Sequence, residues 1–208
     1  MGDVMDFQLE QRLWRQGIAR IAGVDEVGRG CLAGPVVAAA CILPAGSDPL
    51  EGVRDSKLIK REERAEIAEV IVRNAIAVSL GAASRREIDR INIRAASVLA
   101  MKRALARIGS WDYALIDGPF PPEFAGDPAE GVIDGDALSP SIACASILAK
   151  ICRDDLMTRL ARRHPEYGWD RNAGYGTAAH RAALASYGPT PHHRRSFRPV
   201  SQLMLALE

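Results

Sequence analysis

The sequence predicts an α/β protein in which a central mixed sheet is flanked by helices. Short runs rich in Val, Ala and Ile alternate with longer stretches whose apolar residues recur at helical spacing, as in an α/β layer fold. The run at 35–43 is apolar throughout, as in a strand that is buried on both faces. The length of 208 residues suits one domain. We therefore expect a single domain over residues 1–208, with an α/β core at about 18–163 and a helical C-terminal segment at about 164–208.

Local signals set the boundaries of the expected elements. Pro44 ends the strand at 35–43, and charged and apolar residues at helical spacing then indicate an amphipathic helix. Ser84 with a Glu three residues later forms a capping box that begins a helical turn. Ser139 and Pro140 suit the N-cap and the first position of a long helix. In chain order we expect a helix to about residue 15, strands at 18–24 and 35–43, a helix at 60–72, a strand at 75–82, a helical turn from 84, a helix at 91–108, strands at 113–116 and 131–133, and helices at 140–163, 177–187 and 199–207.

Composition excludes several classes of protein. With 48 % hydrophobic and 25 % charged residues the chain is of the globular type, and no apolar stretch approaches the ~20 residues that span a bilayer. The N-terminus lacks the basic and apolar regions of a secretory signal, so we expect a cytoplasmic protein with no membrane contact. The cysteines have no C-x-x-C spacing, which favours reduced thiols over disulfides or a zinc site; they are Cys31, Cys41, Cys144 and Cys152.

Charge is unevenly distributed along the chain. The net charge of +1 argues against a tight, non-specific coat on nucleic acid. Residues 151–208 hold nine Arg and five acidic residues, so this part carries +4 and the first 150 residues carry −3. An acidic N-terminal part followed by a basic C-terminal part fits a metal site beside a phosphate-binding surface.

Acidic residues stand at the ends of three expected strands. Asp25 and Glu26 end the first, Asp117 follows the strand at 113–116, and Asp136 follows the one at 131–133. Strand ends deliver side chains into clefts, and hard cations such as Mg²⁺ prefer oxygen ligands. Four carboxylates can hold two ions ~3.5–4 Å apart. Asp before Gly is also a frequent turn signal, so turn residues are the alternative.

An ordered series of short motifs covers the chain from about residue 20 to residue 200. The first is Gly-Val-Asp-Glu-Val-Gly-Arg-Gly-Cys-Leu-Ala-Gly-Pro-Val-Val at 23–37. With these motifs in this order, the sequence resembles the type 2 ribonuclease H family, bacterial ribonuclease HII. The later motifs are Asp-Ser-Lys-Leu at 55–58, Glu-Ile-Asp at 87–89 with Ile-Asn-Ile at 91–93, Ile-Asp-Gly at 116–118, Gly-Asp at 135–136, Ser-Ile-Leu-Ala-Lys at 146–150 with Arg-Asp at 153–154, Gly-Tyr-Gly-Thr at 174–177 with His180, and His-Arg-Arg-Ser-Phe at 193–197.

The resemblance implies a ribonuclease H-like fold and an endonuclease. Such an enzyme hydrolyses the RNA strand of RNA/DNA hybrids, cuts 5′ of single ribonucleotides in duplex DNA, and leaves a 3′-hydroxyl and a 5′-phosphate. It implies that the catalytic, metal-binding carboxylates are Asp25, Glu26, Asp117 and Asp136, which bind Mg²⁺ or Mn²⁺, as two ions when substrate is bound. The family usually has Lys where this chain has Asp134. That change replaces a positive charge by a negative one, which weakens phosphate attraction or lets Asp134 compete with Asp136 as a ligand.

The resemblance also implies substrate-binding residues. The Gly28-Arg29-Gly30 loop is expected to sense the 2′-hydroxyl of the ribonucleotide, because glycines let the backbone approach a strand closely. Tyr175 is expected to pack against the sugar on the deoxyribonucleotide side of the junction, and Ser56 and Lys57 to contact phosphates. The alternatives without a binding role are a flexible turn for the glycine-rich loop, an aromatic covering the core for Tyr175, and a solvated loop for Ser56 and Lys57.

Further basic residues are weaker candidates. The run at 192–195 looks like a phosphate-binding patch, although Arg194 is alternatively structural and paired with an acid. Lys150 and Arg153 fit a solvated helix face, and His180 fits a helix-face histidine with satisfied hydrogen bonds.

Partners follow from the same reasoning. We expect a monomer that binds RNA/DNA hybrids and ribonucleotide-containing duplex DNA. The string Gln-Leu-Met-Leu-Ala-Leu at 202–207 resembles peptides that dock in the bacterial sliding clamp, while an ordinary helix packed on the domain is the alternative. Ribonuclease HIII, a DNA nuclease of the same superfold and a non-catalytic hybrid-binding protein are the competing functions.

Overall fold

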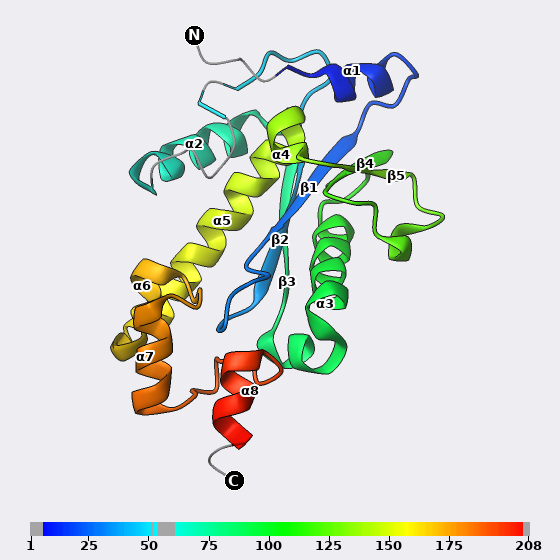
Figure 1. Ribbon diagram of the computed structural model, residues 1–208. Coiled ribbons are helices and arrows are strands. Elements are labelled where there is room, and N and C mark those ends of the chain that lie inside the picture. The colour runs from blue at the N-terminus through cyan, green and yellow to red at the C-terminus, as the bar shows by residue number, and fades with distance from the viewer. Residues whose placement is uncertain (1–5, 51, 54–60, 206–208) are drawn as a thin grey trace.

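The computed structural model describes residues 6–50, 52–53 and 61–205. Its centre is a five-stranded sheet with the order β3-β2-β1-β4-β5 (Figure 1). β1 is antiparallel to β2, and β2 to β3, whereas β1, β4 and β5 run parallel. This mixed sheet with flanking helices confirms the predicted fold class. The strands are β1 (Ile21–Val27), β2 (Val36–Ile42), β3 (Ala77–Ala83), β4 (Tyr113–Asp117) and β5 (Ala129–Val132).

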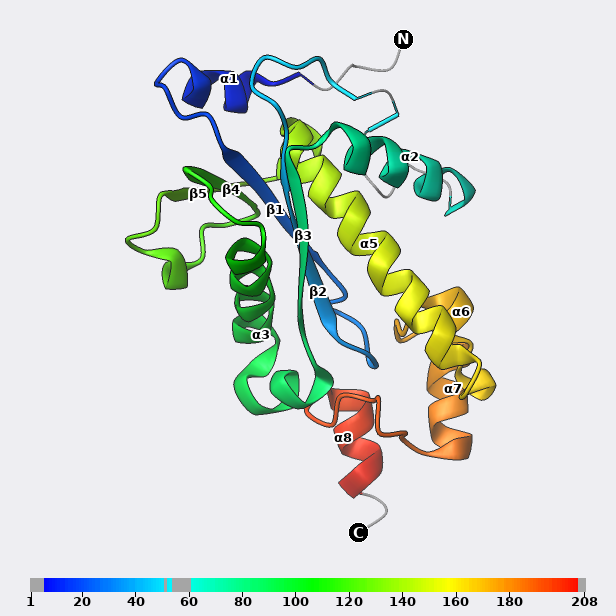
Figure 2. The ribbon, with the colours of Figure 1, turned by 180° about the vertical axis from the view of Figure 1, so that it is seen from behind.

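Helices cover both faces of the sheet (Figure 2). α3 (Arg85–Arg107) packs on β2 and β3, and α5 (Pro140–Ala161) crosses β1 and β2 on the opposite face. A Cβ added at Gly23 would lie 2.1 Å from the carbonyl carbon of Ser141, so only glycine allows the start of α5 to approach β1 this closely. α5 begins where Ser139 accepts a hydrogen bond from the Ile142 amide, as its sequence predicts.

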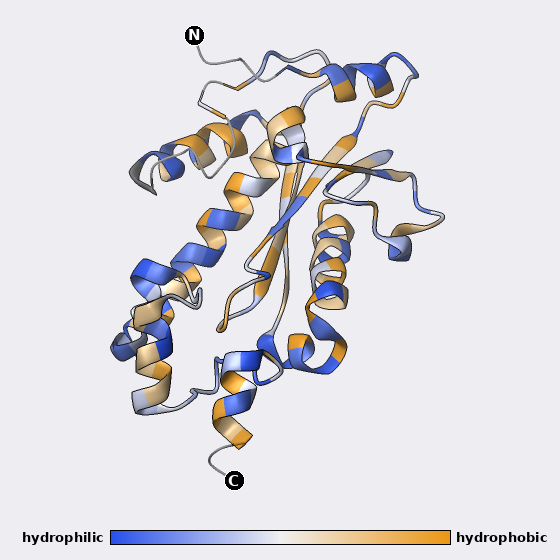
Figure 3. Ribbon diagram, in the orientation of Figure 1, coloured by the Kyte–Doolittle hydropathy of each residue, from blue (hydrophilic) through white to orange (hydrophobic). Residues whose placement is uncertain are grey.

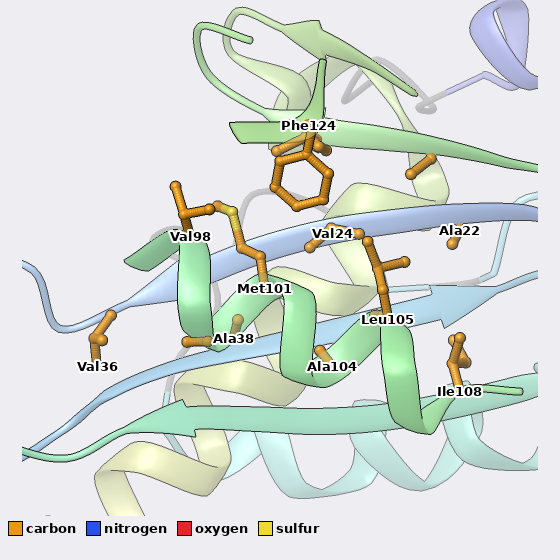
Figure 4. Packing of buried hydrophobic residues seen from close by; sticks show 14 of the residues in the cluster. Ala22, Val24, Val36, Ala38, Val98, Met101, Ala104, Leu105, Ile108 and Phe124 are labelled. Carbon is orange, nitrogen blue, oxygen red and sulfur yellow. The ribbon is translucent and has the colours of Figure 1, made fainter. Parts of the chain in front are cut away.

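The apolar core lies on both sides of β2. Ala38, Ala40 and Ile42 face α3, while Ala39 and Cys41 face α5, so the strand is buried on both faces as its sequence indicates. Figure 4 shows the α3 side, where Val98, Met101 and Leu105 lie over β1 and β2. Hydrophobic and hydrophilic residues alternate along the helices (Figure 3).

The remaining helices lie before, between and after these elements. A Glu from α1, Glu10, is buried, and its Oε1 accepts from the hydroxyls of Ser139 and Ser141 at the start of α5. The C-terminal part is helical, as expected: α6 packs on α5, α7 packs on η2, and α8 lies apart from α5, below the start of α3 in Figure 1. The bounds are α1 (Gln8–Trp14), α2 (Arg61–Asn74), η1 (Pro122–Phe124), α4 (Gly135–Leu138), η2 (Pro165–Tyr167), α6 (Trp169–Asn172), α7 (Ala178–Tyr187) and α8 (Arg198–Leu205).

Three comparisons with the sequence-based predictions bear on the site and on α3. β1 continues through Asp25 and Glu26 to Val27, because all of 22–27 pairs with β2. The expected turn from 84 and helix at 91–108 are two halves of α3, kinked at Asn92, whose φ of 67° interrupts the helix. Asp136 lies in the helical turn α4 and not at a strand end, because β5 ends at Val132.

No helix among the described residues is long and apolar enough to cross a membrane. All four cysteines are free, in agreement with the expected reduced thiols.

Candidate active site

A cleft of about 260 Å³ opens beside β1 and brings the four predicted carboxylates together. Asp25 and Glu26 come from β1, Asp117 from the end of β4, and Asp136 from α4. The lining also includes residues from the loop after β1, from α5 and from the segment before α7. The residues are Asp25, Glu26, Val27, Gly28, Arg29, Gly30, Asp117, Asp136, Ser146, Lys150 and Tyr175.

Strand register explains why these carboxylates meet. Val24 pairs with Ile116 in the parallel β1–β4 ladder, so Asp25 and Asp117 are the next residues along the two strands. The Gly135 amide donates to Oδ1 of Asp117 at 2.8 Å, which ties the end of β4 to the turn that carries Asp136. The sheet and this one hydrogen bond therefore fix three separate parts of the chain around the cleft.

The carboxylates are buried and crowded. Asp25 and Asp136 are each 7 % exposed. The pKa of Asp25 is raised to about 8, mainly by burial; the charges of Glu26 and Asp117 contribute to the rise, and a hydrogen bond from Ser146 opposes it. Burial also raises the pKa of Glu26, although Arg29 opposes this through an ion pair at 3.0 Å. Such a site favours a bound cation, because a cation stabilises the ionised carboxylates that burial and like charge disfavour.

The donor set fits a hard divalent cation. Within residues 6–50, 52–53 and 61–205, no three His, Cys, Asp or Glu side chains lie close enough together to hold a metal ion by themselves. Mg²⁺ usually takes one or two carboxylates together with water and substrate phosphate, so it needs no such cage. The four oxygen-bearing side chains of the cleft meet that requirement.

The loop at 28–35 forms one edge of the cleft and is held from behind by two buried arginines. Arg194 donates to the carbonyl oxygens of Gly28 at 2.6 Å, Arg29 at 2.7 Å and Gly34 at 3.0 Å. Arg153 donates to the carbonyl oxygens of Ala33 and Pro35 in this loop. It also donates to the carbonyl oxygen of Ala173, in the segment that carries Tyr175. Because these bonds occupy the carbonyls, the path of the loop backbone is fixed.

Gly28 is required in this loop for two reasons. Its φ is +94°, a conformation that favours glycine, and an added Cβ would lie 2.1 Å from Nε of Arg153. The predicted glycine-rich loop therefore has a close packing partner that the sequence pattern did not identify.

Arg153 and Arg194 correct two interpretations made from the sequence. Both are fully buried, so Arg153 is not on a solvated helix face, and Arg194 has the structural role that was its alternative and is not part of an exposed phosphate patch. The bonds of Arg194 end on carbonyl oxygens and not on an acid. A sequence signal for Arg153 does exist, because it follows Ser146 and Ala149 at helical spacing on the buried face of α5.

Tyr175 lines the cleft and is 42 % exposed. Its backbone pairs with Cys31 of the 28–35 loop, and its carbonyl oxygen lies 2.8 Å from Nδ1 of His180. His180 is fully buried and also meets Trp169 and His193, which agrees with the expected satisfied helix-face histidine. The two loops that carry Arg29 and Tyr175 thus form one connected unit.

The other predicted residues have different outcomes. Lys150 lines the cleft and pairs with Asp154 at 2.8 Å. Ser56 and Lys57 lie outside the described residues. Asp134 is exposed and has φ 53°, and it is Asp136 that lines the cleft.

Known proteins resemble this chain in sequence and in fold. The family model described as Ribonuclease HII matches residues 22–200. A ribonuclease HII of Thermosynechococcus vestitus is 56 % identical, with 90 % of this chain and 88 % of that protein covered. One of Ruegeria pomeroyi is 54 % identical, with 96 % and 85 % covered.

Solved structures show the same architecture. Ribonuclease H2 from Pyrococcus horikoshii superimposes with a TM-score of 0.73 at 22 % identity, over 90 % of this chain and 98 % of that one. Bst ribonuclease HIII in complex with Mn²⁺ has a TM-score of 0.70 at 18 % identity, over 91 % and 70 %. These structures share the ribonuclease H-like fold, and the family match covers most of the sequence. The chain therefore belongs to the ribonuclease HII family of endoribonucleases.

Proposed function

We propose that this chain hydrolyses the RNA strand of RNA/DNA hybrids and also cuts 5′ of single ribonucleotides embedded in duplex DNA. The products carry a 3′-hydroxyl and a 5′-phosphate. Ribonuclease H activity on RNA/DNA is the activity of the family to which the chain belongs. The observation that carries the proposal is the cleft, where four carboxylates adjoin a glycine-rich loop and an exposed tyrosine.

The carboxylates have the central role in this proposal. Asp25, Glu26, Asp117 and Asp136 would hold two divalent cations, Mg²⁺ or Mn²⁺; an Mn²⁺ complex is known for the neighbour Bst ribonuclease HIII. When bound, such ions supply an activated water and stabilise the leaving oxygen. Ser146 donates a hydrogen bond to Asp25 and so orients its carboxylate.

Selection of the substrate is assigned to the two connected loops. The backbone of Gly28, Arg29 and Gly30 senses the 2′-hydroxyl of the ribonucleotide, in a position fixed by Arg194. Tyr175 packs on the following sugar, where a ring leaves no room for a 2′-hydroxyl. Ser56 and Lys57 remain proposed phosphate contacts.

The domain proposal follows from the same cleft. We treat residues 1–208 as one domain whose helical C-terminal segment forms one wall of the substrate groove. Support comes from Tyr175, which lies in that segment and lines the cleft. Support also comes from the pairing of Ala33 with His193, which joins the segment to the loop after β1.

Cleavage assays separate this proposal from its alternatives. Three duplexes of one sequence are compared, with and without Mg²⁺: all DNA, DNA with one ribonucleotide, and an RNA/DNA hybrid. We expect metal-dependent cutting of the last two and none of the first. Cutting of the all-DNA duplex would indicate a DNA nuclease, and binding without cutting would indicate a non-catalytic hybrid-binding protein.

The C-terminal helix is a further candidate contact. Leu203 packs partly against Leu32, Leu184 and Val200, whereas Leu205 is 73 % exposed. We infer that the end of the chain can dock in a sliding clamp; a ribonuclease HII of Archaeoglobus fulgidus, 26 % identical, is known in complex with PCNA. A peptide of residues 200–208 should bind purified clamp, and absence of binding at ~100 μM would exclude useful affinity.

A further inference from the structure

A second pocket adjoins the catalytic cleft. It has a volume of about 190 Å³ and lies between α3 and the segment that follows β4. Glu26, Arg29 and Asp117 line both the cleft and this pocket, but Tyr175 lines the cleft alone. The carboxylates therefore separate this pocket from the tyrosine.

A buried hydroxyl lies in its wall. Ser97 of α3 is 4 % exposed, and its Oγ has no hydrogen-bond partner among the described residues. An unsatisfied buried hydroxyl costs free energy, so it calls for an explanation, and a polar ligand in the pocket supplies one. Val98 and Met101, also from α3, make the neighbouring wall apolar (Figure 4).

The rim is basic and aromatic. Arg94 is paired with Glu123 at 3.4 Å, but the two side chains are 62 % and 38 % exposed, so this surface pair is weak and easily exchanged for a phosphate. Phe120 is 40 % exposed and stands on the opposite wall. An exposed ring and a guanidinium that line the same pocket can bind a base and a phosphate of a nucleic-acid strand.

We propose that this pocket is the subsite for the nucleotide on the 5′ side of the scissile phosphate, and that it favours a ribonucleotide there. The inference rests on the proposed function, in which the ribonucleotide lies on the 3′ side of the scissile phosphate and Tyr175 takes the deoxyribonucleotide that follows it. The hydroxyl of Ser97 bonds the 2′-hydroxyl of the sugar, Arg94 contacts a phosphate, and Phe120 supports the base. Deoxyribose lacks the 2′-hydroxyl that Ser97 would bond.

Two duplexes test the hydroxyl contact. One holds a single ribonucleotide in DNA, and the other holds two consecutive ribonucleotides, with cutting measured at the bond on the 5′ side of the second. We expect kcat/KM of the wild type to be about fivefold higher on the second duplex, the size of one neutral hydrogen bond. Ser97→Ala should remove this advantage and leave cutting of the single-ribonucleotide duplex within about twofold. Alanine suits the helix and removes an unpartnered oxygen, so the variant should fold.

Ser201→Ala is the matched control, because Ser201 also lies in a helix but bonds the carbonyl of Arg198 away from the pocket. Retention of the advantage in Ser97→Ala, or its absence in the wild type, overturns the subsite. Equal losses on both duplexes would mean a structural role for Ser97 and also overturn it. If the wild type cuts neither duplex, the proposed function fails instead.

The phosphate contact has a separate readout in binding. Without metal, fluorescence anisotropy of Arg94→Gln on the second duplex should show a salt slope lower by about one unit. Arg73→Gln removes a comparable surface pair, that with Glu69 on α2, and should leave the slope unchanged. An equal slope for Arg94→Gln and the wild type would contradict the phosphate contact.

Discussion

Buried charge occurs in two adjacent regions, the cleft and the arginine pair behind the 28–35 loop. In the cleft, carboxylates crowd one another and the pKa of Asp25 rises to about 8 through burial first and like charge second. Behind the loop, burial lowers the pKa of Arg194 to about 10, yet its guanidinium bonds several carbonyl oxygens. Buried charge costs free energy unless it is paired and hydrogen-bonded.

The difference separates two uses of a buried charge. Crowded carboxylates are costly for the protein alone and become favourable once a cation is present, which suits a reactive centre. A guanidinium bonded by backbone oxygens adds no reactive group and instead fixes the backbone. We therefore expect substitutions in the first region to change chemistry with little loss of stability, and substitutions in the second to do the reverse.

Asp25→Asn is expected to have the largest effect on activity. Cleavage of both RNA-containing duplexes should fall by about a thousandfold or more, since a charged group at the reacting centre is lost. The melting temperature without metal should stay level or rise, because Asn is neutral at a buried position where burial and the charges of Glu26 and Asp117 disfavour a carboxylate. Steady-state kinetics and thermal unfolding check both points; activity within tenfold of wild type would refute the assignment of the metal site.

Arg194→Met is expected to give the largest change in stability. It leaves carbonyl oxygens of the 28–35 loop unsatisfied, so the free energy of unfolding should fall by about 3 kcal/mol, measured in urea. Arg103→Met is the matched control, because Arg103 also bonds a carbonyl, that of Ala82, but its side chain is 39 % exposed and does not line the cleft. Equal losses in the two variants would show that the arginine behind the loop has no special role.

The same contrast shows what the sequence could predict. The carboxylates follow or lie within apolar runs, which the residue pattern identifies as strands. The pairing of β1 with β4 then brings Asp25 beside Asp117. The burial of Arg194 depends on contacts with residues 160 or more positions away, such as Gly34 and Gly28, and local periodicity contains no signal for such contacts.

Other details escaped for local reasons. The positive φ of Asn92, whose Oδ1 accepts from the Ala95 amide, is not evident from the sequence, although it separates two helical parts as expected from the turn at 84 and the helix at 91–108. The partner strand β2 prolongs β1 past the point where its apolar run ends, so Asp25 and Glu26 lie inside the strand. Ser97 could not be singled out, since nothing in the sequence shows that its hydroxyl lacks a partner.

Tyr175→Ala tests whether the connected loops select the substrate independently of the hydrolysis step. Activity on a single embedded ribonucleotide should fall about tenfold more than activity on a long hybrid with Mn²⁺, since stacking on one nucleotide contributes about 1–3 kcal/mol. The ratio of kcat/KM values is the measurement. Equal losses on the two substrates would remove the selectivity role.

A smaller effect is expected in the pH dependence of stability. Burial lowers the pKa of His193 to about 3, from an ordinary value of 6.5, and lowers that of His180. Between these pH values the unfolded chain binds more protons, so the stability is complete above about pH 6.5 and falls as the pH drops towards 3. In urea unfolding, His193→Gln should flatten this fall; an unchanged slope would contradict it.

Asp134→Lys is expected to have the smallest effect, and it asks how far the field of the cleft extends. Asp134 is exposed and two residues from Asp136, but it does not line the cleft. A lysine there removes one negative charge near the carboxylates and adds a positive one on a long, flexible side chain, so substrate should bind more tightly and less Mg²⁺ should be needed. If the new ammonium reaches a phosphate, the salt slope of binding should steepen by about one unit. The left-handed backbone at this position favours Asp over Lys, so thermal unfolding is measured alongside to separate a small loss of stability from a change in binding. An unchanged affinity and salt slope would mean that the electrostatic influence on substrate ends with the residues that line the cleft.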